Sequence, residues 1–312
     1  MKRLSFLSLL FLLFVGGCAE GYRVPITKIG HANTKERIWL DMDPACGEQL
    51  HYSDPDDCLA YFVARRTHMN IVGVSTTGGN APENDTWEIA QRLVGKEIPL
   101  HRGLGGCQSS AVNALKKASD IGPLRIIALG PLTNVSTFLK CHPEAVQNIT
   151  EVLFVGSRFE NESFVINQNW FIQMDLKDLN VVEDVEAVQI TIDSGVKLTY
   201  IPFEAGKIVP IRYGSMVRNG IKLPDYLHER LRGWDLMFSA LAGTDGFLSF
   251  DAVAVAFALW PEQFSCVPVD SRLVQSELIV EIEQGDAGEN TRCIPQNGDR
   301  LRSLIFSALS LP

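Results

Sequence analysis

The sequence predicts an α/β fold: an open, mainly parallel sheet with helices on both of its faces. The first observation is that short, continuous apolar segments, typical of buried strands, alternate with amphipathic segments typical of helices. The second is that no internal repeat, low-complexity tract or linker divides residues 22–312. With 312 residues, of which 46% are hydrophobic, the chain is long enough to bury a large core. We therefore expect a single Rossmann-like domain over residues 37–312.

The expected elements follow one another along the chain in a strand–helix alternation. The strand segments cover residues 37–41, 69–76, 124–130, 151–156, 188–193, 197–203 and 276–283. The helix segments cover residues 56–66, 83–95, 132–141 and 251–260. The stretch from Met216 to Leu241 is typical of one or two further helices.

The first eighteen residues, MKRLSFLSLLFLLFVGGC, have the order of a secretory signal. Lys2 and Arg3 precede an apolar run that is too short to be a comfortable membrane span. The final VGGC resembles the lipobox of bacterial lipoproteins, in which the cysteine is acylated and becomes the mature N-terminus. We therefore expect a signal peptide over residues 1–17, a lipid anchor on Cys18, a tether over residues 18–36, and an exported protein in the cell envelope or periplasm. A plain signal peptide cleaved nearby is the alternative.

The expected mature chain is acidic. Removing the signal peptide takes away two of the 28 basic residues and no acidic one, which leaves 26 against 37 and a net charge of −11. No basic run or basic-aromatic stripe remains, so the composition argues against nucleic acid as a partner.

An even number of cysteines remains after Cys18, and in an exported protein this permits disulfides. Their connectivity cannot be read from the sequence, and ordinary buried thiols are the alternative for Cys58 and Cys141, which lie in helical patterns. No cysteine or histidine spacing is typical of zinc. The six residues are Cys46, Cys58, Cys107, Cys141, Cys266 and Cys293.

One stretch, DMDPACGEQLHYSDPDD from Asp41 to Asp57, contains five aspartates and one glutamate. It directly follows the apolar segment RIWL, which is typical of a buried strand. Carboxylates at this density usually hold a hard cation through oxygen ligands, or divide acid and base roles between them. A solvated acidic loop is the alternative.

Three polar clusters follow expected strands, and the carboxyl ends of parallel strands form the edge where open α/β sheets bind ligands. Asp41 and Asp43 follow the first strand, Gly78-Gly79-Asn80 follows the second, and Gly130-Pro131-Leu132-Thr133-Asn134 follows the third. Each cluster alone is compatible with an ordinary turn. Together, beside the aspartates, they predict a ligand site.

Several segments resemble, in order, the successive motifs of the inosine-uridine-preferring nucleoside hydrolases. They are DMDPA, SDPDDCLA, GGNAPENDTWEIAQRLV, ALGPLTNVSTFLKCHPE, FDAVAVAFALWPEQF and VEIEQGDAGENTRC. The resemblance spans Arg37 to Arg292. It implies a nucleoside hydrolase architecture and a Ca²⁺-dependent hydrolase that splits the N-glycosidic bond of ribonucleosides or related N-ribosides into base and ribose.

The resemblance also implies roles for individual residues. The Ca²⁺ ligands would be Asp43, Asp57, the backbone carbonyl of Thr133, and Asp251, which agrees with the preference of calcium for hard oxygen ligands. Asp43 would also accept a proton from the attacking water.

Other residues would bind the sugar or support the site. Asp56 and Asn80 would bind ribose hydroxyls, and Asp41 would support the ligands from behind. The Glu-Phe-Asn sugar-binding segment of the family has a loose counterpart in VINQNWFIQMD, where we place the asparagine at Asn169, with Asn167 as a rival.

Two departures from the family pattern concern the substrate. Twelve residues separate Asp43 from Asp56, more than is usual in the family, and this insertion predicts either a lid or specificity loop or a plain surface loop. Phe250 precedes Asp251 where a histidine often protonates the departing base. Candidate donors in its place are His51, Tyr52, Tyr213, His228, Trp234 and Asp235.

Two other functions compete with the hydrolase. A phosphatase of the haloacid dehalogenase type also begins with a strand and Asp-x-Asp, but it leaves Asp56, Asp57 and Asp251 without roles. A non-catalytic lipoprotein that binds nucleosides or glycosides with calcium would use the same ligands. The sequence also leaves a homo-oligomer open.

Replacing Cys18 with serine tests the expected lipid anchor. A serine has no thiol to acylate, so the variant should leave the membrane fraction or mislocalise, as measured by fractionation and immunoblotting. Unchanged membrane fractionation would favour an ordinary signal peptide.

Overall fold

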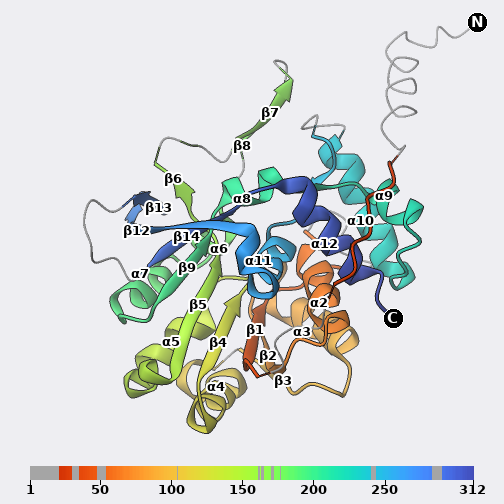
Figure 1. Ribbon diagram of the computed structural model, residues 1–312. Coiled ribbons are helices and arrows are strands. Elements are labelled where there is room, and N and C mark those ends of the chain that lie inside the picture. Colours follow the sequence, from red (N-terminus) through yellow and green to blue (C-terminus); the bar gives the residue numbers. More distant parts are fainter. Residues whose placement is uncertain are drawn as a thin grey trace, which may run out of the picture.

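A ten-stranded sheet forms the centre of the described part of the molecule (Figure 1). The computed structural model describes residues 21–29, 35–47, 54–103, 105–160, 162, 165–169, 172–175, 177–239, 244–282 and 290–312. The strand order is β3 (Leu100–Arg102), β2 (Ile71–Thr76), β1 (Ile38–Met42), β4 (Leu124–Ala128), β5 (Ile149–Val155), β9 (Leu198–Ile201), β14 (Thr291–Pro295), β12 (Phe264–Val274), β13 (Glu277–Ile282) and β6 (Arg158–Phe159).

The sheet is mainly parallel, as predicted. Neighbouring strands from β3 to β14 all pair in parallel. Only β12 reverses the direction, because it pairs antiparallel with both β14 and β13. Two small sheets lie apart from it: β10 (Pro210–Ile211) with β11 (Phe247–Leu248), and β7 (Val165–Asn169) with β8 (Ile172–Asp175).

Helices cover both faces of the sheet, and each face has its own hydrophobic core. One core contains residues of α2 (Asp56–Arg66), α3 (Glu83–Val94), α8 (Phe203–Ile208), α9 (Tyr213–Arg218), α10 (Asp225–Met237), α11 (Phe250–Leu259) and α12 (Gly298–Leu309). The other contains residues of α4 (Ser110–Ile121), α5 (Thr133–Cys141), α6 (Leu179–Val182) and α7 (Val185–Asp193).

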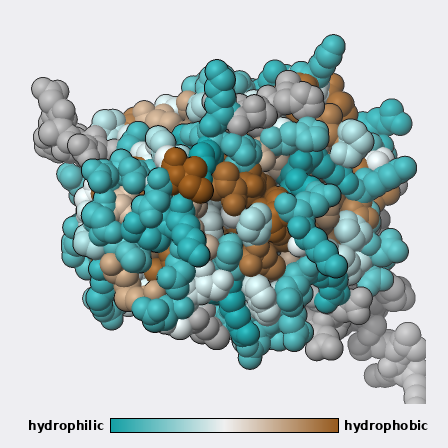
Figure 2. All heavy atoms as spheres, turned by 90° about the horizontal axis from the view of Figure 1, so that it is seen from below, coloured by the Kyte–Doolittle hydropathy of each residue, from teal (hydrophilic) through white to brown (hydrophobic). Residues whose placement is uncertain are grey.

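The strands alternate between these two cores. In β1, Ile38, Leu40 and Met42 belong to the first core, whereas Trp39 belongs to the second. Successive side chains of a strand point to opposite faces, so a strand covered on both sides is apolar at most positions; Asp41 is the exception in β1. Outside, the face seen in Figure 2 is mostly hydrophilic, with apolar side chains gathered near its centre.

One expected strand is wrong. Residues 188–193 belong to helix α7, which begins after Asp184, whose side chain accepts a hydrogen bond from the backbone N–H of Ala187 at 3.0 Å. The β-branched residues of VQITID suggested a strand, but Ala187, Val188 and Thr191 are buried at a helical spacing. The expected helices in the stretch from Met216 to Leu241 are present as the end of α9 and as α10.

Part of the expected tether packs against the domain. The backbone N–H groups of Tyr22, Val24 and Thr27 donate to the side chains of Ser215 (3.0 Å), Asn219 (3.0 Å) and Ser307 (2.8 Å). These partners lie on α9, just after it, and on α12, so the folded domain includes residues before 37. Residues 1–20, with Cys18, lie outside the described residues. Within the described ranges, no helix is both long enough and apolar enough to span a bilayer.

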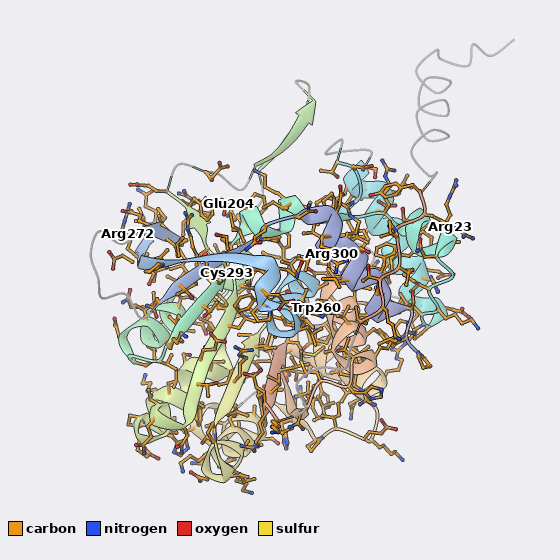
Figure 3. All side chains as sticks on the ribbon, viewed as in Figure 1. Arg23, Glu204, Trp260, Arg272, Cys293 and Arg300 are labelled. Atoms are coloured by element: carbon orange, nitrogen blue, oxygen red, sulfur yellow. A yellow bond between two sulfur atoms is a disulfide. The ribbon has the colours of Figure 1, made fainter. Side chains whose placement is uncertain are left out.

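All six cysteines after Cys18 form disulfides. Cys46 pairs with Cys58, Cys107 with Cys141, and Cys266 with Cys293. The structure therefore answers the question that the sequence left open for Cys58 and Cys141. In Figure 3, Cys293 marks the place where β14 runs beside β12.

Candidate functional site

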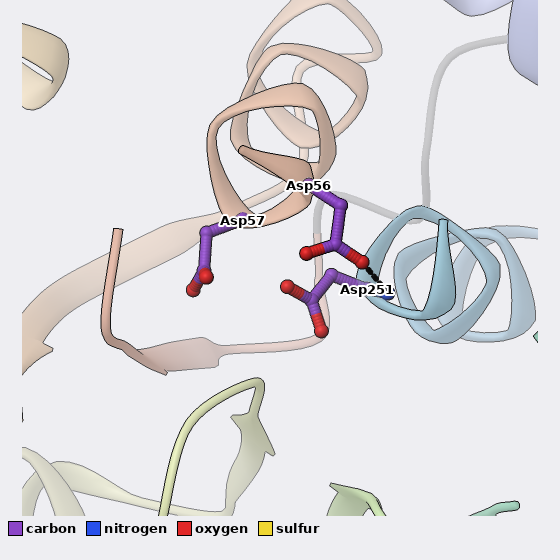
Figure 4. A group of neighbouring side chains, drawn as sticks. All are labelled: Asp56, Asp57 and Asp251. Carbon is purple, nitrogen blue, oxygen red and sulfur yellow. Dashed lines mark hydrogen bonds between the residues drawn. The ribbon is translucent and has the colours of Figure 1, made fainter. Parts of the chain in front are cut away.

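Three aspartates from two helices meet at the carboxyl edge of the sheet (Figure 4). Asp56 and Asp57 open α2, and Asp251 lies in the first turn of α11. Each offers a carboxylate oxygen, and these oxygens lie within 4.8 Å of one another. All three side chains are buried, so the carboxylates meet in a space that water scarcely enters.

Asp43 and Asn80 connect this cluster to the ends of β1 and β2. The backbone N–H of Asp43 donates to Oδ1 of Asp57 at 3.1 Å. Asn80 donates from its backbone N–H to Oδ2 of Asp43 at 2.6 Å, and from its side-chain amide to Oδ2 of Asp57 at 3.3 Å. The backbone N–H of Asp251 donates to Oδ2 of Asp56 at 3.2 Å. Asn80 therefore shares one hydrogen-bonded group with Asp43 and Asp57, and Asp56 and Asp251 form a second bonded pair beside it.

Two glycines allow the chain to close around Asp43. A Cβ atom at Gly79 would collide with Oδ2 of Asp43, and one at Gly130 would lie 2.7 Å from its Oδ1. Gly79 and Gly130 therefore have a steric role. They let two strand ends approach a fully buried carboxylate.

Asp41 lies within β1, before the end of the strand, and its side chain is fully buried. Its Oδ1 accepts hydrogen bonds from the hydroxyl of Ser75 and from the side-chain amide of Asn134, the latter at 2.8 Å. Asn134 also donates to the carbonyl of Thr76 at 2.9 Å. Asp41 thus ties together the ends of β1, β2 and the start of α5, which is a supporting position.

Burial dominates the electrostatics of the cluster. It raises the pKa of Asp57 to about 7, with repulsion from Asp56 as the next cause. It also raises the pKa values of Asp43 and Asp251 well above their usual range, and neighbouring carboxylates raise them further. The positive ends of the α2 and α11 dipoles offset part of this repulsion. A hard divalent cation would offset far more of it, and carboxylate oxygens at this spacing fit such a cation.

Thr133 lies at the start of α5. Its backbone carbonyl accepts hydrogen bonds from the hydroxyls of Ser136 (3.1 Å) and Thr137 (2.7 Å). Its own hydroxyl donates to Asp184 at 2.7 Å. Thr133 and Asn80 line one hollow, and Asn80 also lines a separate cavity whose wall includes Asp56 and Asp251. Its role as a ligand remains a prediction.

A cavity of about 240 Å³ opens beside the cluster. One part of its wall is polar and includes Asp54, Asp56, Asn80 and Asp251. Another part is apolar, and its residues are Phe203, Trp234, Met237, Phe238 and Phe250. The cavity is therefore lined by both acidic and aromatic side chains.

Asp178 and Asn180 also line this cavity, and sequence reasoning missed them. Asp178 accepts a 2.7 Å hydrogen bond from the backbone N–H of Ser157, and burial raises its pKa to about 7. Ser157 holds this position with φ of 87°, a strained value for a residue with a Cβ. Asn180 donates to the carbonyls of Leu129 (2.6 Å) and Val155 (2.9 Å).

The order of Asp178-Leu179-Asn180 is acid, apolar residue, asparagine, which is the order of the Glu-Phe-Asn segment. A search for that chemical order at the start of a helix, here α6 with Asp178 at its N-cap position, would have found it. Asn169 ends β7, and its side chain lies outside the described part, as does that of Asn167. In Figure 1 the β7–β8 hairpin extends away from the central sheet. Asp54, whose Oδ1 accepts a 3.1 Å hydrogen bond from the backbone N–H of Asp56, was also missed.

Of the candidate donors for the departing base, Trp234 is the one in the described residues that lines the cavity. Asp235 accepts a hydrogen bond from the backbone N–H of Tyr213, and His228 packs edge-on against the Tyr213 ring. These three lie on α9 and α10 away from the cavity wall. His51 and Tyr52 lie outside the described residues. Phe250 stacks on Phe203, with ring centres 5.6 Å apart.

The chain matches the family model of the inosine-uridine preferring nucleoside hydrolases over residues 38–300. It therefore belongs to this family and is a hydrolase that acts on N-glycosyl bonds.

Its relatives are distant. An uncharacterized protein of Schizosaccharomyces pombe is 24% identical over 276 residues, which is 74% of this chain and 78% of that protein. The pyrimidine-specific ribonucleoside hydrolase RihB of Escherichia coli is 23% identical over 201 residues, 53% of this chain and 58% of RihB. A solved structure of the purine-preferring ribonucleoside hydrolase from Gardnerella vaginalis superposes with a TM-score of 0.73 at 18% identity, over 88% of this chain and 98% of that one. The structural likeness confirms the fold.

Without a cation, the free energy of unfolding should fall as the pH rises. Burial holds the pKa of Asp41 and of Asp57 at about 7 in the folded chain, whereas carboxyls of an unfolded chain titrate near pH 4. The folded state therefore binds more protons between about pH 4 and 7, and stability is lost across that window. EDTA-treated protein should melt at a lower temperature at about pH 7.5 than at about pH 5.5.

A divalent cation should reverse this loss. At a concentration about 100-fold above its Kd it should raise the Tm by about 5 °C at neutral pH, and by less in acid, where protons compete for the carboxylates. Differential scanning calorimetry of both forms at both pH values measures this. A Tm that is the same with chelator and with cation at neutral pH would contradict a cation site.

Proposed function

We propose that this chain is a Ca²⁺-dependent hydrolase that splits the N-glycosidic bond of ribonucleosides or related N-ribosides and releases base and ribose. The observation that carries the proposal is the meeting of Asp56, Asp57 and Asp251 within 4.8 Å, beside a cavity lined by both acidic and aromatic side chains. A ribose fits the chemistry of the acidic side chains, which we take as the acidic end, and a base fits that of the aromatic ones, the aromatic end.

Calcium is the proposed ion because the available ligands are oxygens. Asp43, Asp57 and Asp251 would hold it, with the carbonyl of Thr133 as the ligand implied by the family resemblance. Calcium tolerates flexible geometry and several carboxylates; Asp57 and Asp251 would supply these from the starts of α2 and α11, and Asp43 from just after β1. When bound, the cation lowers the pKa of coordinated water.

Asp43 is the proposed general base. Its carboxylate is fully buried and is oriented by the backbone N–H of Asn80, so it can accept a proton without first leaving its position. Water adds its oxygen to the anomeric carbon and gives a proton to Asp43. The electron pair of the C–N bond leaves with the base, which takes up a proton from solvent unless it was already cationic in the substrate.

Four polar side chains would hold the ribose. Asp56, Asn80, Asp178 and Asn180 line the cavity, and they supply acceptors and donors for sugar hydroxyls. The carboxylates also stabilise the positive charge that develops on the ribose as the bond to the base breaks, which is electrostatic stabilisation aimed at the transition state.

The base would lie at the aromatic end. Phe203 and Phe250 form a stacked wall there, and Trp234 supplies an indole N–H that can donate a hydrogen bond to a base but is too weak an acid to protonate it. The names of the relatives include both purine-preferring and pyrimidine-specific enzymes, so family membership leaves the base open. Because Phe250 cannot donate a proton, we expect weak or altered activity on inosine.

The proposed location is the cell envelope. The lipobox-like VGGC would place a lipid on Cys18, and the segment from residue 21 onward would then hold the domain close to the membrane, on the outer side of the cytoplasmic membrane. The six paired cysteines support an oxidising compartment.

A nucleoside panel tests the activity. The purified domain is incubated with purine and pyrimidine ribonucleosides and with cationic N-ribosides, with and without Ca²⁺, and released base and reducing sugar are assayed. The proposal expects Ca²⁺-dependent release of both products from at least one member. Calcium and nucleoside binding with no turnover would favour a binding protein.

Replacing Asp43 with asparagine should abolish hydrolysis without unfolding the domain. Asparagine keeps the shape and removes the proton acceptor, so we expect kcat to fall by at least about 10³-fold. Asp120→Asn is the matched control, because Asp120 is an exposed carboxylate paired with Lys116. Circular dichroism checks the fold of both variants. Activity of the Asp43 variant within tenfold of the wild type would contradict the assignment of Asp43 as the general base.

Replacing Phe250 with histidine should give no large gain on inosine. The phenyl ring stacks on Phe203, and Gly206 approaches it so closely that a Cβ there would collide with it. An imidazole in this packed place loses apolar contact with the Phe203 ring. We expect kcat/KM for inosine to change by less than about tenfold. A gain of two or more orders of magnitude would show that the missing histidine alone limits the wild type.

A further inference from the structure

The disulfide Cys46–Cys58 links the two segments that carry Asp43 and Asp57, two of the proposed calcium ligands. Cys46 lies three residues after Asp43, and Cys58 directly follows Asp57. Both cysteines are fully buried. The bond therefore joins the same two segments that are joined by the hydrogen bond from the Asp43 N–H to Oδ1 of Asp57.

The end of β1 and the start of α2 need a direct bond to stay close to each other. The chain between the two cysteines includes the insertion, and the sequence separation is 12. A connection of this length leaves the end of β1 and the start of α2 free to separate unless something else holds them. The carboxylates of Asp43, Asp56 and Asp57 oppose their approach, because like charges repel strongly at buried positions.

We propose that Cys46–Cys58 is a positioning element for the cation site: it holds Asp43 and Asp57 at their mutual distance before the cation binds. The inference rests on the proposed function, because it concerns the affinity of that site for its cation. Ligands that are already assembled bind with a smaller loss of conformational entropy, so the disulfide increases affinity without contacting the ion. It takes no part in the chemical step.

The other two disulfides provide matched controls. Cys107–Cys141 joins the 3-10 helix η1 (Gly106–Gln108) to the end of α5, with a separation of 34, and Cys266–Cys293 joins β12 to β14, with a separation of 27. None of these four cysteines adjoins a carboxylate of the cluster. If disulfides act only by restricting the unfolded chain, the bond with the shortest loop should matter least.

The experiment compares three double variants of the mature chain: Cys46→Ala with Cys58→Ala, Cys107→Ala with Cys141→Ala, and Cys266→Ala with Cys293→Ala. Chelator-treated protein is titrated with CaCl₂ by calorimetry, Tm is measured by differential scanning calorimetry, and kcat is measured at saturating calcium. A Cys46→Ser, Cys58→Ser pair serves as a second version of the first variant, in case alanine at both buried positions prevents folding.

We expect the Kd for calcium to rise about 10- to 100-fold in the Cys46/Cys58 variant alone, the range found when residues that orient metal ligands are lost. Its kcat at saturating calcium should stay within about threefold of the wild type, and its loss of Tm should not exceed that of the controls. Equal calcium affinity in all three variants would overturn the inference. So would failure of both Cys46/Cys58 pairs to fold while the controls fold, because the bond would then be a general structural one. Wild-type protein that neither binds calcium nor hydrolyses any N-riboside would instead overturn the proposed function, and the inference with it.

Discussion

The repulsion between buried carboxylates is the constraint on which the rest of the site depends. Asp43, Asp56, Asp57 and Asp251 are all buried, and neighbouring carboxylates raise the pKa values of Asp43 and Asp251 beyond the effect of burial. Without other interactions, these four carboxyl groups would move apart or remain protonated. The fold opposes this with the N-termini of α2 and α11, the amide groups of Asn80, and a covalent bond beside the cluster. Such an arrangement is stable at neutral pH when positive charge is supplied from outside, by a cation or by a substrate that becomes positive.

The sheet gives these carboxylates a rigid base. Trp39 is buried in the core opposite to that of α2, and its indole N–H donates to the hydroxyl of Ser75, which in turn donates to Asp41. Asp41 receives a second hydrogen bond from Asn134 at the start of α5. These hydrogen bonds hold together β1, the end of β2 and the start of α5, which follows β4, around Asp41, two residues before Asp43. The buried apolar strands therefore hold in place the polar residues at the edge of the sheet.

How far the sequence predicts this molecule depends on the range of the interactions involved. The central strands were predictable, because both faces are covered and each strand is a short apolar run, and the acidic edge followed from the polar residues after β1, β2 and β4. Residues 188–193 were misread because the propensity of β-branched residues is weaker than the capping and burial that make α7 a helix. Asp178 and Asn180 were missed because their place in the cavity depends on a contact between distant segments. Asp178 is held by a hydrogen bond from the backbone of Ser157, whose conformation is strained, and sequence spacing does not reveal this contact. The disulfide partners were undetermined for the same reason: pairing is a property of the folded chain.

The two ends of the cavity place different demands on a substrate. In the proposed function, the acidic end interacts most strongly with the transition state, because that is when the ribose is positive. The aromatic end contacts the base through Phe203, Phe250 and the ring of Trp234, and stacking of this kind depends little on which heterocycle is bound. Selection between bases must then come from how easily each one leaves without a strong acid beside it. An N-riboside whose base already carries a positive charge leaves as a neutral molecule and needs no proton, so the absence of a histidine at Phe250 would penalise it least. Discrimination at this site would therefore be set by leaving-group chemistry more than by shape.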